Sequence, residues 1–136
     1  MLNKIISVIN NTLKEAGAEN VCSAFDCRSL EQKGRKTLVV TSVDKLECST
    51  PVFTEYFVYM PFRADVGITL AAPLSEDSGR LFDYFERVIA PAFGSLGSLD
   101  CRLTAVSVKK DSNINRLVLK AVYSAKGIQK TEREAA

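Results

Sequence analysis

The four cysteines are the side chains of this sequence most able to do chemistry, and their spacing argues against a reactive or metal-binding role. They are Cys22, Cys27, Cys48 and Cys101. The one close pair, Cys22 and Cys27, is neither a C-x-x-C redox motif nor half of a zinc knuckle. The chain has no histidine, so a zinc site would need all four thiolates or added carboxylates. We therefore expect free cysteines, most of them buried as small apolar side chains, with no metal and no cofactor.

The sequence also lacks the base that nucleophilic catalysis usually needs. A serine or cysteine nucleophile is most often activated by a neighbouring histidine. The run GSLGS at 94–98 is not a G-x-S-x-G nucleophile elbow, and it follows a predicted helix instead of a strand. No phosphate-binding loop of the G-x-x-x-x-G-K type occurs. Carboxylates such as Asp83 and Glu86 fit a solvated helix face. We expect no catalytic residue and no enzymatic activity.

The length and net charge of the chain favour no particular class of binding partner. The chain has 136 residues, of which 18 are Lys or Arg and 16 are Asp or Glu, so its net charge is +2. Such a balance gives no attraction to nucleic acid or to a membrane surface. Basic residues cluster at 33–36 and at 109–110, but no aromatic residues lie between them as they do in RNA-binding sheets. No apolar run approaches the ~18 residues of a membrane span, so we expect a cytoplasmic protein.

Hydrophobic periodicity predicts an α+β fold. Apolar residues between 2 and 16 recur with a helical period, and Gly17 can end that helix. Strict alternation over Ala64–Leu70 predicts a strand with one face on a core. The predicted order is α-β-β-β-α-β-β: a helix at 2–16, strands at 37–48, 52–60 and 63–72, a helix at 75–93, and strands at 100–110 and 115–125. We expect an antiparallel sheet of about four to five strands packed against two helices. A weaker strand pattern covers 21–28, and 29–36 reads as a loop.

The second predicted helix has a clear start and a proline near its end. Ser75 is a good N-cap, and Glu76 and Asp77 follow in the first turn, where they favour the helix dipole. Pro91 should kink or loosen the helix about one turn before it. The expected core face is formed by Leu81, Phe82, Phe85, Val88, Ile89 and Phe93.

The C-terminal residues read as a tail. After residue 125 the chain has one apolar side chain larger than alanine, Ile128. We therefore expect a single α+β domain over 1–125 and a flexible tail over 126–136. Ordering such a tail would cost about 1–2 kcal/mol per residue, so we expect the sheet, and not the tail, to carry any self-association.

An aromatic strand is the best candidate for binding. Aromatic residues gather between Phe53 and Phe62, and burying both faces of that strand would need a second layer or a partner. A core strand with tyrosine hydroxyls at its rim and a subunit interface are both compatible with this pattern. The candidate interface residues are Tyr56, Tyr59, Arg63, Asp65, Asp111, Asn113 and Tyr123.

This layout resembles the tail terminator proteins, also called tail completion or minor tail proteins, of long-tailed phages and prophages. The resemblance rests on the N-terminal amphipathic helix, the three antiparallel strands, the helix sequence FDYFERVIAPAF at 82–93 and the closing hairpin. It covers about residues 1–125 and is closest over Phe53–Ala72 and the helix that follows. The Cys22/Cys27 pair and the loop at 29–36 correspond to no feature of that family.

The resemblance implies a non-enzymatic role in phage tail assembly. Proteins of this family form a ring, usually of six copies, on the head-proximal end of the tail tube. They stop tube polymerisation and present a surface to the head connector. The implied partners are other copies of the chain, the tail-tube protein and the head connector, with no membrane and no specific nucleic acid. The implied location is the bacterial cytoplasm during assembly and the virion tail afterwards.

Two other functions are compatible with the same residues. One is a small α+β module that binds a ligand or a protein partner. The other is an RNA-binding domain that uses the basic loops. Light scattering separates the first from a ring-forming protein, and salt-dependent nucleic-acid binding would support the second.

Overall fold

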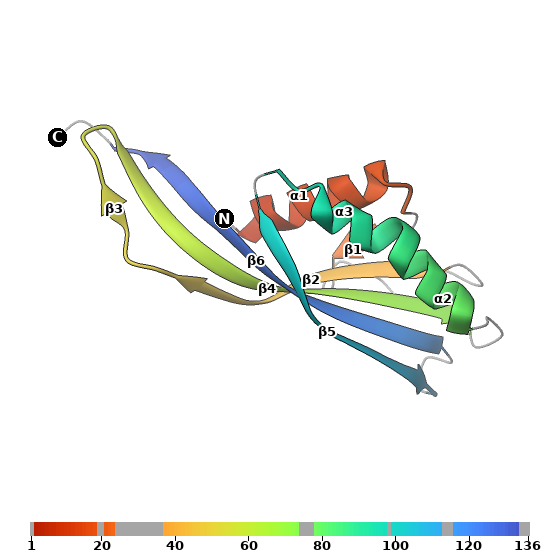
Figure 1. Cartoon of the computed structure of the whole chain (residues 1–136). Helices are drawn as coiled ribbons and strands as arrows, with labels where there is room; N and C mark the ends of the chain where they lie inside the picture. Colours follow the sequence, from red (N-terminus) through yellow and green to blue (C-terminus); the bar gives the residue numbers. More distant parts are fainter. Residues whose placement is uncertain are drawn as a thin grey trace.

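The computed structural model describes residues 2–18, 21–23, 37–73, 78–97, 99–112 and 116–133. These residues form one sheet with the helices on a single face (Figure 1). The elements in chain order are α1 (Leu2–Glu15), β1 (Val21–Ser23), β2 (Leu38–Cys48), β3 (Val52–Phe53), β4 (Phe57–Pro73), α2 (Ser78–Tyr84), the π-helical turn η2 (Phe85–Ile89), α3 (Ala90–Gly94), β5 (Asp100–Asp111) and β6 (Arg116–Glu132). The predicted α+β class, with an antiparallel sheet against two helical segments, is confirmed. The predicted loop at 29–36 lies outside the described residues.

The sheet is built around two long strands. Its order is β1-β2-β4-β6-β5, and β3 pairs with the beginning of β4. β4 and β6 pair antiparallel over their whole lengths, from Phe57 opposite Glu132 to Pro73 opposite Arg116. β1 pairs parallel with β2, and the other described pairings are antiparallel. β5 is therefore an edge strand that pairs with β6 alone in this order.

The predicted separation of strands 52–60 and 63–72 is wrong, because β4 continues through Pro61. The predicted strands 52–60 and 63–72 are in fact one strand of 17 residues, preceded by the short β3. In an antiparallel ladder the N–H and C=O of one residue face the same neighbour. The Ser49 N–H donates to the Pro61 carbonyl at 2.9 Å, so the Pro61 nitrogen faces the gap between β2 and β3. β2 ends at Cys48, so the missing Pro61 N–H falls beyond the pairing of β2 with β4 and removes none of its pairs.

The predicted C-terminal tail is also wrong for residues 126–132, which continue β6. They pair with residues 57–63 of β4. The Arg133 N–H then donates to the Tyr56 carbonyl at 2.7 Å, and its guanidinium donates to the Thr54 carbonyl at 2.8 Å. Backbone pairing with β4 orders this segment, although few of its side chains are apolar. The sequence analysis treated the sheet and the tail as separate candidates for self-association. That distinction does not hold, because residues 126–132 are part of the sheet.

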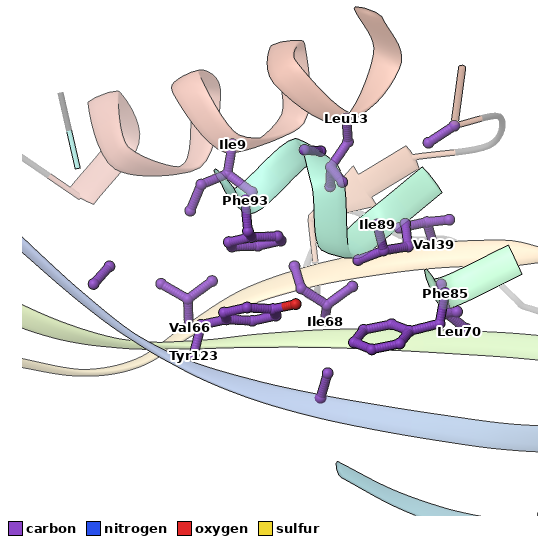
Figure 2. Close-up of a cluster of buried hydrophobic side chains, with 14 of the residues drawn as sticks. Ile9, Leu13, Val39, Val66, Ile68, Leu70, Phe85, Ile89, Phe93 and Tyr123 are labelled. Atoms are coloured by element: carbon purple, nitrogen blue, oxygen red, sulfur yellow. The ribbon is translucent and has the colours of Figure 1, made fainter. Parts of the chain in front are cut away.

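α1 lies on the sheet through the predicted apolar stripe. Ile5, Ile9 and Leu13 are buried, and Figure 2 shows Ile9 and Leu13 pointing toward the sheet. Gly17 ends the helix in the left-handed region with φ 101°. The Gly17 N–H donates to the Lys14 carbonyl at 3.1 Å and the Ala18 N–H to the Leu13 carbonyl at 2.9 Å. These two bonds are those of a Schellman motif.

The second helix loosens before Pro91, as predicted. The Ala90 N–H donates to the Phe85 carbonyl, five residues back, which gives a π turn directly before the proline. Leu81, Phe85, Ile89 and Phe93 are all buried at a constant spacing of four. Such a spacing drifts around a regular helix of 3.6 residues per turn, and the wider π turn compensates for this drift.

Phe82 was predicted to be in the core, but it is 42% exposed. Val88 is only half-buried. The four-residue spacing selects one narrow stripe of the second helix for burial, and these two residues lie beside it.

The core lies between the helices and one face of the sheet (Figure 2). The Phe93 and Tyr123 rings are stacked, with centroids 3.9 Å apart and planes 5° from parallel. The sheet contributes large aliphatic residues, among them Val39, Val66, Ile68, Leu70 and Leu119. On the opposite face, the described residues form a small buried cluster of Leu38, Ala71 and Val118. Most of that face is not covered by the described helices.

Candidate functional site

The predicted interface residues do not form one surface. Tyr56 is exposed, whereas Tyr59 is half-buried in β4. Tyr123 is 4% exposed, so it belongs to the core and not to a surface. Asp111 ends β5, far along the sheet from Tyr56. Asn113 lies outside the described residues.

Arg63 and Asp65 lie in the middle of β4, on the face of the sheet that carries no helix. They face Glu47 and Lys45 of β2. The Arg63 guanidinium donates to the Glu47 carboxylate at 3.1 Å, and the Lys45 ammonium lies 2.7 Å from the same carboxylate. A hydrogen bond with Glu47 raises the pKa of Lys45, and the same contact lowers the pKa of Glu47. Because these side chains are exposed, the arrangement is a solvated ladder of charges.

The first exposed apolar surface is the part of the sheet that extends beyond the helices. We call it the blade, and it consists of β3, residues 54–63 and residues 126–133. Figure 1 shows it projecting away from the helices toward the C-terminus. Four of its large apolar side chains are 56–67% exposed: Val52, Phe53, Tyr56 and Ile128. Isolated exposed apolar residues are common, but a group of four on one projection suggests a contact surface.

The tip of the blade is held by local contacts. The Phe57 N–H donates to the Thr54 hydroxyl at 3.1 Å, and the Thr54 N–H donates to the Phe57 carbonyl at 2.8 Å. The Lys130 ammonium lies 3.9 Å from the centre of the Phe57 ring. The Arg133 guanidinium lies 5.6 Å from the centre of the Phe53 ring. These hydrogen bonds and cation–π contacts connect the residues of the tip to one another.

The second exposed apolar surface is the edge strand β5. Leu103, Val106 and Val108 are each 40–45% exposed. They lie opposite Tyr123, Ala121 and Leu119 of β6, all buried on the helix side of the sheet. The apolar row of β5 therefore faces the helix side but lies beyond the cover of the helices. Sequence reasoning missed this row, because the β5 pattern looks the same whether or not a helix lies above it.

A groove of 1240 Å³ lies where the blade joins the helix-covered sheet, and the free cysteines Cys48 and Cys101 are among its lining residues. Its walls include Phe62, Phe93, Leu99 and Cys101. Burial, helped by Asp100, raises the pKa of Cys101 to about 11. The Cys101 thiol is therefore neutral near pH 7 and a poor nucleophile.

The described cysteine side chains and helices support no further type of site. Neither Cys48 nor Cys101 forms a disulfide; Cys48 is exposed and Cys101 is half-buried, while the side chains of Cys22 and Cys27 lie outside the described residues, so the expected burial of most cysteines stays a prediction. Within the described ranges no three metal-ligating side chains gather. No described helix has the length and hydropathy to cross a membrane.

Comparison with known proteins finds similarity in structure only. No protein-family model matches the chain, and no curated protein matches its sequence. Among solved structures, the sheath/tube terminator of the PVC extracellular contractile injection system, in its extended state, aligns with a TM-score of 0.51 and 13% identity. The alignment covers 100% of this chain and 59% of the terminator chain. At this identity the similarity shows a shared fold.

A second similarity is too weak to use. The type 4 fimbrial biogenesis protein PilO of Pseudomonas aeruginosa aligns with a TM-score of 0.31 and 12% identity. The alignment covers 96% of this chain and 69% of PilO. A score this low carries no argument about fold or function.

Proposed function

We propose that this chain is a non-enzymatic tail-assembly protein of the terminator type. Its copies form a ring, with six the expected number, that caps the tail tube and joins it to the head connector. The observation that carries this proposal is the fold shared with a sheath/tube terminator over the whole chain. The element order of the sequence resembles terminators independently of that comparison.

The exposed surfaces are consistent with such a ring. A closed ring of identical copies uses heterologous contacts, in which one patch of each copy meets a different patch of the next. Each copy therefore needs two separate patches. The chain has two, the blade and the apolar row of β5, and they lie on different parts of the sheet (Figure 1).

In this role the protein acts in the bacterial cytoplasm while tails assemble and remains in the tail of the finished particle. It carries out no reaction and needs no cofactor. A small ligand- or protein-binding module is the alternative, and it predicts a monomer that binds in the groove beside Phe62 and Leu99. An RNA-binding domain is the other alternative; of its two basic clusters, 33–36 lies outside the described residues, and Lys109 and Lys110 are exposed near the end of β5.

The proposal is tested by tube length. Tail-tube protein from the same genome is polymerised with and without this chain, and the lengths are measured by negative-stain electron microscopy. A terminator limits the length and appears as extra density at one end of each tube. Unchanged lengths, with no density at either end and no co-sedimentation, would rule the proposal out.

A further inference from the structure

The sheet changes direction where the blade leaves the helix-covered part (Figure 1). Near this place β2 and β5, the strands that flank the central pair β4 and β6, each contain one extra residue. The pairing of β2 with β4 skips Asp44, and the pairing of β5 with β6 skips Thr104. An extra residue of this kind is a β-bulge, which bends its strand and increases the local twist.

The two bulges lie beside the same row of paired residues. Val66 of β4 pairs with Tyr123 of β6. The Asp44 bulge lies on one side of this row, and the Thr104 bulge lies on the other. β4 and β6 pair with each other without a register shift here, so the irregularities that bend the sheet are in the flanking strands. Because the blade begins only a few residues away, this bend sets its direction.

A glycine of β4 makes room for the first bulge. Gly67 pairs with Ser42 of β2 and with Val122 of β6. A Cβ atom at Gly67 would lie 2.7 Å from the Ser42 Oγ and 3.1 Å from the Asp44 Oδ2, and both distances are shorter than ordinary contacts. The side chain of Asp44 therefore lies over the Gly67 backbone, in space that the side chain of any other amino acid would enter.

Polar contacts hold the Asp44 carboxylate in this position. The Ser42 hydroxyl donates to Asp44 Oδ1 at 3.0 Å, and the Lys120 ammonium of β6 lies 4.0 Å from Asp44 Oδ2. Asp44 thus connects β2 to β6 across β4. At the other bulge, the Thr104 hydroxyl donates to the Val122 carbonyl of β6 at 2.9 Å. We call the first group of residues the bend cluster: Ser42, Asp44, Gly67 and Lys120.

We propose that the bend cluster fixes the direction of the blade relative to the helix-covered sheet. Asp44 is the positioning residue, and Gly67 provides the space that it occupies. Twist between neighbouring strands varies from about −10° to −35°, and the contacts over Gly67 select one value at the bulge. Exposed charge pairs contribute little to stability, so the cluster acts on the angle of the sheet and not on whether the chain folds. It acts within one chain and does not depend on the proposed ring.

The direction of the blade is measured as a distance between two copper ions. The chain has no histidine, so introduced histidine pairs bind copper(II)–nitrilotriacetate selectively once exposed Cys48 is alkylated. One pair replaces Asp83 and Arg87, whose side chains meet in an ion pair on the second helix. The other pair replaces Gln129 and Thr131, which lie on one face of β6 in the blade. Double electron–electron resonance then gives the distribution of copper–copper distances.

Two variants and a matched control are compared in this background. Gly67→Ala places a methyl group against Asp44, and Asp44→Ala removes the carboxylate. Gly94→Ala is the control, because a Cβ added at Gly94 meets no atom within 4 Å. Residues 57–63 extend the blade by about 20 Å at ~3.3 Å per residue, so a turn of about 10° moves its tip by about 3 Å. We expect both variants to shift or broaden the distance distribution by about this amount, while the control leaves it unchanged.

The double variant Gly67→Ala with Asp44→Ala tests whether the two residues act together. Both changes disrupt the same contact, so the combined shift should be smaller than the sum of the single shifts; additive shifts would contradict the shared role. Urea midpoints verify folding, and Ser42→Ala replaces Gly67→Ala if that variant does not fold. An unchanged distribution in Asp44→Ala, or an equal shift in Gly94→Ala, would overturn the proposal. A lowered midpoint with an unchanged distance would also overturn it, because the cluster would then only stabilise the fold.

Discussion

Replacing Phe85 with alanine tests how strongly the second helix is held to the sheet. Phe85 is 8% exposed at the start of η2 and belongs to the same buried cluster as Leu70 and Ile89 (Figure 2). Truncation removes the ring and leaves a cavity that the stiff sheet can close only in part. Such substitutions cost about 3–5 kcal/mol. For a small domain with a total stability of about 5–15 kcal/mol, this is a large fraction.

Urea denaturation followed by circular dichroism measures the loss. With a slope of about 1–3 kcal/mol per molar urea, a loss of about 4 kcal/mol lowers the midpoint by roughly 1–4 M. Phe82→Ala is the matched control, since it removes the same ring three residues earlier from a position that is 42% exposed. Its expected cost is below about 1 kcal/mol. Equal midpoint shifts for the two substitutions would refute the assignment of the buried stripe.

Three further predictions concern the thiols, a buried tyrosine and the end of β6. At pH 8, iodoacetamide should modify exposed Cys48 rapidly and Cys101 far more slowly, because burial raises the pKa of Cys101 to about 11; equal rates by mass spectrometry would contradict this. Burial raises the pKa of Tyr123 to about 12, so the folded state holds its proton more tightly than the unfolded state does. The resulting stability is complete below pH 10 and is lost between pH 10 and about 12; urea midpoints of wild type and Tyr123→Phe should diverge over that window, and parallel curves would exclude the effect. Ending the chain after Lys126 removes the β6 partners of residues 57–62, so amide hydrogen exchange there should become fast while the core stays protected; unchanged protection would show that β6 does not hold the blade.

Sequence periodicity correctly predicted the helices and strands that bury one apolar face. The apolar stripe of α1, the left-handed Gly17 and the loosening before Pro91 all follow from the period of a helix and from the covalent structure of glycine and proline. The alternation at 64–70 predicted the inward face of β4 because side chains alternate strictly along a strand. The order of elements, and with it the resemblance to terminators, follows from these same patterns.

The pairing of strands that lie far apart in the sequence could not be predicted from these local patterns. Pro61 reads as a break, and residues 126–132 read as a tail, because neither local pattern shows that a neighbouring strand is present. The strand is present because β4 and β6 pair over their full lengths, and backbone hydrogen bonds between strands do not depend on side-chain type. Tyr123 reads as a rim residue, but the ring of Phe93 stacks on it.

The sequence by itself therefore determined where most of the helices and strands form and which face of most of them is apolar. The tertiary structure alone decided how far the helices extend over the sheet. That limit leaves the blade and the apolar row of β5 uncovered, and it follows from where the second helix ends and α1 begins, not from the residues of β5 themselves. Side-chain exposure depends on every element packed nearby, so a candidate interface becomes visible only once those elements are in place.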